Sequence, residues 1–246
     1  MKKYLIGLLG LLAISCSRVE ECFQATGEME TRTVFVDDFE QIIINPRVKV
    51  ILQQGDAYQL RIYAGANLQD QVRYTVQDGV LELFDDNTCN YSRSYGSTTV
   101  YVIAPNIQSI YNFSEQKVTN TDTLRYSALR LYGVELFGKT GVGDFDLTLE
   151  ADYVSAESNF VSQFKLNGKT HTLFVGFYHG MSRFEGDELQ AKNAVVYHRG
   201  SNDVTVRVTD TLRAELRSTG DLISKTPSLY KEIDRTYTGQ FYEQFD

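Results

Sequence analysis

Beyond its first residues, this 246-residue sequence lacks long apolar runs, and it also lacks an excess of basic residues. No later stretch approaches about 18 consecutive apolar residues, so we expect no further membrane-spanning helix. The 24 Lys and Arg residues stand against 32 Asp and Glu residues, which gives a formal net charge of −8. This acidic balance argues against nucleic acid and anionic lipid headgroups as partners. Tryptophan is absent and there are only three prolines, whereas 16 tyrosines and 14 phenylalanines favour β-strands.

Metal-binding residues are also scarce. His171, His179 and His198 are the three histidines, and the last two lie 19 residues apart, a spacing at which they would stack on neighbouring coils of a repeat. Two imidazoles without a Cys or carboxylate at ligand spacing make a poor zinc site. The acidic run Asp85-Asp86-Asn87 lacks the further spaced oxygen ligands of a calcium site. We therefore predict no metal and no cofactor.

Carboxylates are numerous but scattered. The adjacent pairs Asp37-Asp38, Asp85-Asp86 and Asp187-Glu188 would point to opposite faces of a strand, so neither member could assist the other. Cleavage of a glycosidic bond needs two carboxyl groups facing one substrate. No such pair is visible, and the sequence predicts no catalytic residues and no enzyme activity.

A repeat of about 20 residues occupies the second half of the chain. Five segments share the order small or turn residue, polar residue, apolar residue. Their apolar members lie 19, 20, 20 and 18 residues apart and are Phe145, Phe164, Phe184, Val204 and Leu222. The polar residues before them, expected to form an outward, solvated column, are Asp144, Gln163, Arg183, Asp203 and Asp221. A second apolar series, about ten residues before four of these, is Val154, Leu173, Ala194 and Leu212. This period predicts an all-β fold, a parallel β-solenoid with coils of about 20 residues.

The first half of the chain alternates apolar and polar residues without this period. Strands are expected at residues 33–36, 41–44, 48–52, 59–64, 72–77, 80–84 and 98–103. Asp78-Gly79 is a two-residue hairpin signal, so antiparallel pairing is expected here. The region either caps the solenoid or forms its first, irregular coils. Residues 236–241 are expected to form the closing strand.

The N-terminus is typical of a secretory signal, with Lys2 and Lys3 before an apolar run at residues 4–14. Residues 12–16, Leu-Ala-Ile-Ser-Cys, resemble a bacterial lipoprotein lipobox. This resemblance implies cleavage before Cys16, lipidation of its thiol and a membrane partner through the lipid anchor. The alternative is an ordinary cleaved signal in which Cys16 is incidental. Ser17 is not an inner-membrane retention signal, which favours the outer membrane, on its periplasmic or cell-surface face.

The two remaining cysteines, Cys22 and Cys89, form an even pair in an exported protein. A disulfide between them would close a loop of 67 residues and contribute roughly 4 kcal/mol in the chain-entropy model. The alternative is two buried thiols.

Tyrosines supply the best binding hypothesis, because each presents a flat apolar face with a polar tip. Eight of them exceed what the core needs: Tyr91, Tyr95, Tyr101, Tyr111, Tyr126, Tyr132, Tyr178 and Tyr197. We take Tyr91, Tyr95, Tyr178 and Tyr197 as candidate binding residues. The alternative is that the tyrosines only stack along the sheets. Thr123 and Thr211, each in an Asp-Thr-Leu segment, resemble acceptors of Bacteroidota O-glycosylation, or else follow a turn Asp into a strand.

Six further segments occur in a recognisable order, at residues 52–56, 64–68, 78–83, 89–95, 100–105 and 218–222. Together with the lipobox they resemble the DUF2807 family, labelled "putative auto-transporter adhesin, head GIN domain", over roughly residues 28 to 240. The resemblance implies a right-handed β-helix-like fold and an envelope location, and it brings no established catalytic residues. The chain departs from the family at residues 111–114 and 176–179, where bulky residues replace glycine and serine in the turns.

The sequence therefore favours an envelope-anchored, non-catalytic adhesion or scaffold module. Its expected partners are a glycan, a surface protein or further copies of itself. The alternative function is a carbohydrate-binding or carbohydrate-cleaving envelope protein. The predicted divisions are a signal peptide (1–15), a lipidated Cys with linker (16–27), an N-terminal β region (28–110), and solenoid repeats with a C-terminal cap (111–246).

Overall fold

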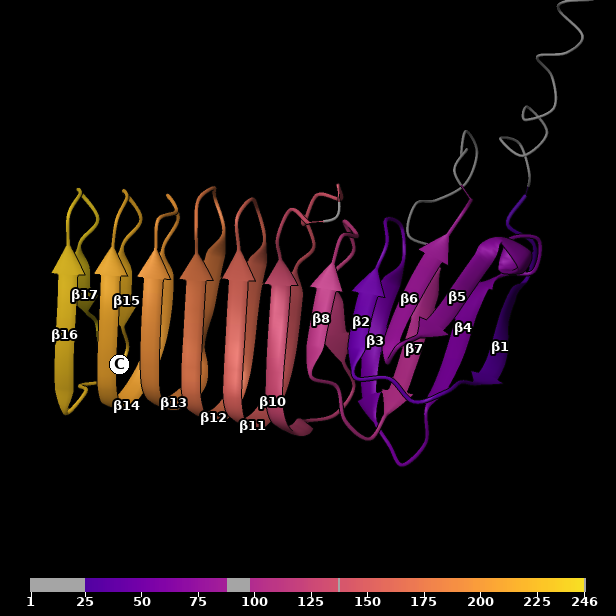
Figure 1. Cartoon of the computed structure of the whole chain (residues 1–246), viewed down its shortest axis with the longest axis horizontal. Coiled ribbons are helices and arrows are strands. Elements are labelled where there is room, and N and C mark those ends of the chain that lie inside the picture. The colour runs from indigo at the N-terminus through magenta and orange to yellow at the C-terminus, as the bar shows by residue number, and fades with distance from the viewer. Residues whose placement is uncertain (1–24, 88–97, 137, 246) are drawn as a thin grey trace, which may run out of the picture.

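The chain winds into a row of stacked β-coils, shown from the side in Figure 1. The computed structural model describes residues 25–87, 98–136 and 138–245. Strands make up 62% of the structure, which is a β-solenoid of about 6 turns. Among the described residues the helical element is a single 3-10 turn, η2 (Gln69–Gln71), and all 17 strands join one hydrogen-bonded network. The predicted all-β solenoid is confirmed.

Each coil contributes one strand segment to each of two stacks, which we call stack A and stack B. In spatial order, stack A contains β1 (Met29–Phe35), β4 (Gln59–Gly65), β7 (Thr99–Ala104), β3 (Lys49–Gln54), β9 (Val118–Asn120), the first halves of β11 (Phe145–Ser158), β12 (Gln163–Phe177), β13 (Arg183–His198) and β14 (Val204–Leu216), then β15 (Leu222–Ser224) and β17 (Phe241–Glu243). Stack B contains β5 (Val72–Gln77), β6 (Val80–Asp85), β2 (Gln41–Ile44), β8 (Ser109–Asn112), β10 (Leu124–Gly133), the second halves of β11 to β14, and β16 (Tyr230–Arg235). The long strands β11 to β14 therefore bend from stack A into stack B.

The register between coils confirms the repeat predicted from the sequence. In stack A, Phe145 pairs with Phe164, Phe164 with Phe184, Phe184 with Val204, and Val204 with Leu222. In stack B, the second apolar series pairs in the same order, from Val154 to Leu212. The near strands in Figure 1 run upward while successive coils move left towards the C-terminus, so the winding is right-handed.

The N-terminal strands extend both stacks, but not in chain order. The coil made by β2 and β3 lies between the β6–β7 coil and the β8–β9 coil, and it pairs in parallel with both. Antiparallel pairing occurs in β1–β4, β4–β7 and the β5–β6 hairpin. In that hairpin Asp78 and Gly79 have positive φ angles of 51° and 73°, as the predicted two-residue turn requires. The boundary predicted between residues 110 and 111 falls inside β8 and remains a prediction.

Aromatic side chains stack along the core. The ring centroids of Phe145 and Phe164 lie 5.2 Å apart in a parallel arrangement, and Phe177 lies 5.9 Å from Phe164. All three side chains are fully buried. Stacked aromatic pairs contribute beyond the area that they bury. Phe160, in contrast, is 41% exposed, because it lies in the turn after β11.

The C-terminal coil closes the solenoid with charges. Lys231 and Arg235 continue the inward positions of the buried Leu212 and Leu216. Across the end of the core, Lys231 forms an ion pair with Glu243. Charges at inward positions are a known protection of exposed sheet edges against pairing with another chain. They oppose self-association through this end.

The expected closing strand at residues 236–241 is wrong in its position. These residues form a turn up to Gln240, and the last coil consists of β16 and β17 on either side of it. The sequence pattern did not predict β16, because it relied on apolar residues at inward positions and β16 has Lys and Arg there.

We expect Phe164→Ala to lower the free energy of unfolding by about 3–5 kcal/mol, because it removes the centre of the aromatic stack. Chemical denaturation followed by circular dichroism measures this change. Phe160→Ala is the matched control and should cost less than about 1 kcal/mol. Equal losses for the two variants would contradict the assignment of Phe164 to the core.

Replacing the charged end by apolar residues, in the double variant Lys231→Leu with Glu243→Leu, should raise the mass in solution above that of the natural chain. The reason is that an apolar end coil can pair with the end of another molecule. Size-exclusion chromatography with light scattering measures the mass. The double variant Lys117→Leu with Asp146→Leu removes a 3.5 Å ion pair from the side of the solenoid and should leave the mass unchanged.

Candidate binding surface

The outer face of stack B carries a row of aligned side chains, one from each coil. The parallel register places them in this order from the N-terminal end: Glu82, Ile43, Tyr111, Tyr132, Glu157, Gly176, Tyr197, Glu215 and Asp234. Neighbouring strands lie about 4.8 Å apart, so the five positions from Tyr111 to Tyr197 span roughly 20 Å. We call this line of residues, together with Tyr178, the tyrosine row.

Aromatic rings cover the centre of the tyrosine row. Tyr111 and Tyr132 are stacked, with centroids 4.4 Å apart and planes inclined by 16°. Gly176 has no side chain, and two aromatic side chains reach this position. A Cβ placed there would lie 2.8 Å from Phe174 Cε1 and 3.1 Å from the Tyr178 hydroxyl. The Tyr178 centroid lies 6.0 Å from that of Tyr197. Phe174 of β12 and Tyr178 of the bulky turn after it therefore cover the one position of the row that lacks a side chain.

Glu157 lies between the two pairs of tyrosines. The Tyr178 hydroxyl donates a hydrogen bond of 2.6 Å to Glu157 Oε2, and Ser155 Oγ donates one of 3.2 Å to Oε1. Burial raises the pKa of Tyr132 to about 12, and the Glu157 charge adds to this shift. Burial and the hydrogen bond to Glu157 also raise the pKa of Tyr178. Both phenols therefore stay neutral at physiological pH and can donate hydrogen bonds.

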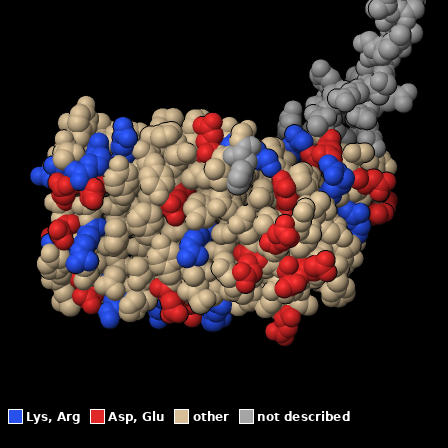
Figure 2. Space-filling view, in the orientation of Figure 1, with Lys and Arg blue, Asp and Glu red and all other residues tan. Residues whose placement is uncertain are grey.

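Figure 2 shows this face in space-filling form. Its centre is mainly uncharged apart from single acidic and basic side chains, and charged side chains are more numerous at the two ends and along the lower edge. Next to Tyr197, a hollow of about 270 Å³ is lined mainly by Val195, Arg213, Glu215, Glu232 and Asp234. A flat aromatic centre with a polar end is a surface suited to binding another molecule.

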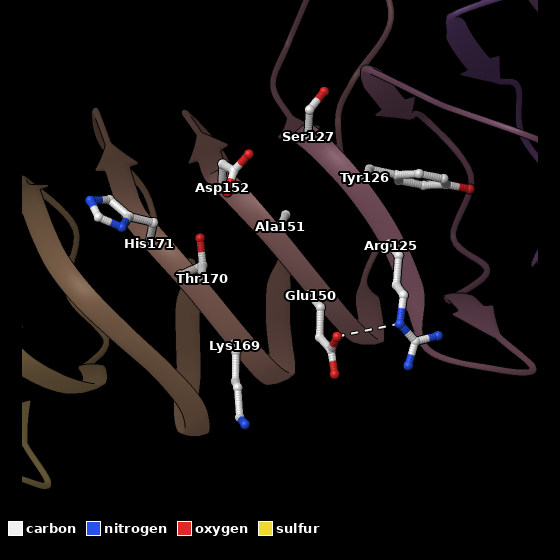
Figure 3. A pocket seen from close by; sticks show the side chains of 9 residues that line it. All are labelled: Arg125, Tyr126, Ser127, Glu150, Ala151, Asp152, Lys169, Thr170 and His171. Atoms are coloured by element: carbon white, nitrogen blue, oxygen red, sulfur yellow. Dashed lines mark ion pairs between the residues drawn. The ribbon is translucent and has the colours of Figure 1, made fainter.

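A second hollow, of about 530 Å³, lies at the outer corner where the strands bend from stack A to stack B (Figure 3). Arg125 and Glu150 form an ion pair of 3.3 Å at one side of it. The small side chains Ala151 and Thr170 lie between two lines of polar residues. This hollow is open, and its charged residues are of both signs.

Three residues at this corner are of the types found in hydrolase triads, namely Ser127, Asp152 and His171 (Figure 3). They lie on the successive strands β10, β11 and β12, so Asp152 is in the middle. A triad needs the histidine between the nucleophile and the acid, joined to both by hydrogen bonds. Among the described residues no hydrogen bond joins these three side chains, and the order is wrong for a triad.

The candidate tyrosines fall into two groups. Tyr178 and Tyr197 lie side by side in the tyrosine row, whereas Tyr91 and Tyr95 lie outside the described residues. Tyr111 and Tyr132, which the sequence offered only as members of a larger set, belong to the same row. Tyr126 was expected to be available for binding, and this is wrong, because it points into the core and is only 5% exposed.

Glu157 is the functional candidate that sequence reasoning missed. Its alignment with Tyr132 and Tyr197 would have identified it as part of the same surface. That alignment can be derived only when the pairing register of stack B is known.

The other predicted sites remain predictions. Cys16, Cys22 and Cys89 lie outside the described residues, so lipidation and the disulfide are not tested. Thr123 is half-buried just before β10. Thr211 is half-buried within β14, and its hydroxyl bonds to Asp210 Oδ1 at 3.3 Å.

The histidines do not form a site. His198 is fully buried and packs edge-on against Phe177 at 5.8 Å, while His179 is exposed. The expected stacking of His179 on His198 is wrong, because the register pairs His198 with Phe177. No group of three or more His, Cys, Asp or Glu residues in the described parts of the chain is arranged to hold a metal ion.

The sequence pattern of the DUF2807 family, described as "Putative auto-transporter adhesin, head GIN domain", matches residues 38–226, which is more than half of the chain. The chain belongs to the DUF2807 family. No curated protein sequence matches it. None of the described helical segments is long and apolar enough to span a bilayer.

Solved structures with the same fold come from Bacteroidales. A putative adhesin from Bacteroides fragilis is 20% identical, with a TM-score of 0.77 over 88% of this chain and 97% of that one. A putative adhesin from Parabacteroides merdae is 15% identical, with a TM-score of 0.63 over 89% and 97%. A putative lipid binding protein from Parabacteroides distasonis is 15% identical, with a TM-score of 0.61 over 89% and 97%. At these identities the likeness shows the fold alone.

Buried His198 should make the stability of this DUF2807 protein depend on pH. Burial lowers its pKa below the ordinary value of 6.5, against the smaller opposing effects of Asp203 and Asp221. A histidine that stays neutral when folded but takes up a proton when unfolded stabilises the fold fully above pH 6.5, and this stability is lost as the pH falls.

We therefore expect the free energy of unfolding to fall by up to about 1.4 kcal/mol per pH unit below that value. Denaturation curves from about pH 7.5 to about pH 5.5, above the range in which ordinary carboxylates titrate, measure the slope. His198→Leu should flatten it, and His179→Gln, at an exposed position, should not. A slope that is unchanged in His198→Leu would contradict the assignment.

Proposed function

We propose that this DUF2807 protein is a non-catalytic adhesion module that is attached to the outer membrane by a lipid on Cys16. The observation that carries the proposal is the tyrosine row, a line of exposed and half-buried aromatic side chains about 20 Å long on one flat face. Membership of a family described as an adhesin head domain, and the same fold in putative adhesins, support the adhesive role.

The position of the row suits an anchored adhesin. Strand β1, the first described strand, lies at one end of stack A, and the charged closing coil lies at the other. A chain anchored ahead of β1 would hold the N-terminal end of the solenoid near the membrane. The tyrosine row runs along the axis between these ends, so part of it would stand away from the bilayer.

The chemistry of the row favours binding over cleavage. The hydrogen-bond partners of Glu157 are two hydroxyl groups, those of Tyr178 and Ser155. Retaining and inverting glycosidases both need a second carboxyl group on the other side of the scissile bond. The described residues show no carboxyl group bonded to Glu157 or sharing a partner with it, so the carbohydrate-cleaving alternative lacks its second catalytic group.

Beads coated with the full chain should adhere to one defined class of ligand on an array that carries both glycans and surface proteins. The double variant Tyr178→Ser with Tyr197→Ser should lose at least about tenfold in affinity, equal to ~1.4 kcal/mol, because it removes half of the aromatic surface. Tyr237→Ser changes a tyrosine that is 64% exposed in the last turn and is the matched control. Undiminished adhesion of the double variant would contradict the proposal.

A further inference from the structure

The carboxylates of the tyrosine row differ in whether they form an ion pair. Glu82 pairs with Lys139 at 2.7 Å, and both Glu215 and Asp234 pair with Arg217, at 2.7 and 2.5 Å. Glu157 is the exception, because it forms no ion pair with any described residue and its partners are neutral hydroxyl groups.

The nearby Arg130 does not neutralise Glu157. Its guanidinium lies over the Tyr153 ring, 5.4 Å from the centroid, and forms no ion pair with Glu157 among the described residues. The centre of the row therefore holds a negative charge that no described residue pairs with.

Two carboxylates of the same face lie beside an aromatic ring, and each of them binds a cation. Lys139 Nζ lies 5.6 Å from the Phe113 ring centroid while it pairs with Glu82. Arg213 lies 5.8 Å from the Tyr230 centroid while it pairs with Glu232 at 3.2 Å. In both places a cation is held by a carboxylate and a ring together. Aromatic faces carry negative charge density, so they attract the same cation that the carboxylate attracts.

Several aromatic rings lie around the Glu157 carboxylate. Tyr178 is bonded to it, Tyr132 is its neighbour in register, and Tyr197 packs beside Tyr178. A carboxylate has about four acceptor positions, and the two hydroxyl donors leave the others available. A partly apolar aromatic surrounding also strengthens the attraction between opposite charges relative to water.

We propose that Glu157, with Tyr132, Tyr178 and Tyr197, binds the ammonium or guanidinium group of a Lys or Arg side chain from a partner protein. This rests on the proposed function, because it names the ligand class of the tyrosine row. Tyr178 is a positioning residue as well as a contact, since its hydroxyl holds the Glu157 carboxylate in place. The row thus selects a basic segment of a partner rather than a neutral sugar chain, whose hydroxyl groups need no counter-charge.

Isothermal titration of the full chain with a synthetic peptide of alternating lysine and glycine tests the proposal. A peptide with glutamine in place of lysine is the neutral comparison. We expect the lysine peptide to bind, the glutamine peptide not to bind, and the affinity to fall as salt is added. Glu157→Gln keeps the size and an acceptor for Tyr178, and it should weaken binding at least about tenfold.

Glu150→Gln is the control for net charge, because it removes one negative charge at the corner hollow and should change the affinity less than about twofold. Equal losses in Glu157→Gln and Glu150→Gln would overturn the proposal, since they would show general attraction to an acidic protein. No binding of the lysine peptide, or equal binding of the glutamine peptide, would overturn it too.

Neutral glycans separate this inference from the proposed function. If a glycan binds equally to the natural chain and to Glu157→Gln, but not to Tyr197→Ser, the row is an adhesive surface and recognition of a cation is refuted. If Tyr197→Ser binds every probe as the natural chain does, the proposed function itself fails.

Discussion

Hydrogen bonding between the backbones of neighbouring coils is the interaction on which the rest of this structure depends. A single coil of about 20 residues buries too little apolar surface to offset the entropy of ordering it, so coils are stable only in contact with other coils. The parallel register then brings equivalent residues together at every step. The same register that stacks Phe145 on Phe164 inside the solenoid also aligns Tyr132 with Glu157 outside it.

Because of this alignment, the outer face consists of rows of residues along the solenoid axis, with one residue from each coil. A substitution in one coil changes one position of a row, while its neighbours in the row come from residues about 20 positions away in the sequence. The residues that would determine binding specificity can therefore change in one coil at a time without disturbing the core. Gly176 illustrates this freedom, because the missing side chain at its position is replaced by Phe174 from the same strand and Tyr178 from the adjoining turn.

Much of the fold was predictable because the repeat is written directly in the sequence. The spacing from Phe145 to Leu222 gave the coils and their register, and Asp78-Gly79 gave a hairpin. The order of the N-terminal coils was not predictable, because pairing between β2 and β8 leaves no local pattern. The candidate surface was predictable in part. Tyr178 and Tyr197 were predicted because tyrosine suits binding, but Glu157 differs from the other carboxylates of the row only in lacking an ion pair, which the sequence does not reveal.

The out-of-order position of the β2–β3 coil has a consequence for how the protein folds. Each repeat from β12 to β14 pairs with the segment about 20 residues before it, so these coils can form one after another at low cost in loop closure. Strand β2, in contrast, must wait for β8, and β3 must wait for β9, which follow more than 60 residues later. When the chain emerges with its N-terminus first, its first coil is therefore exposed longest, and completion of that coil is expected to limit the rate of folding.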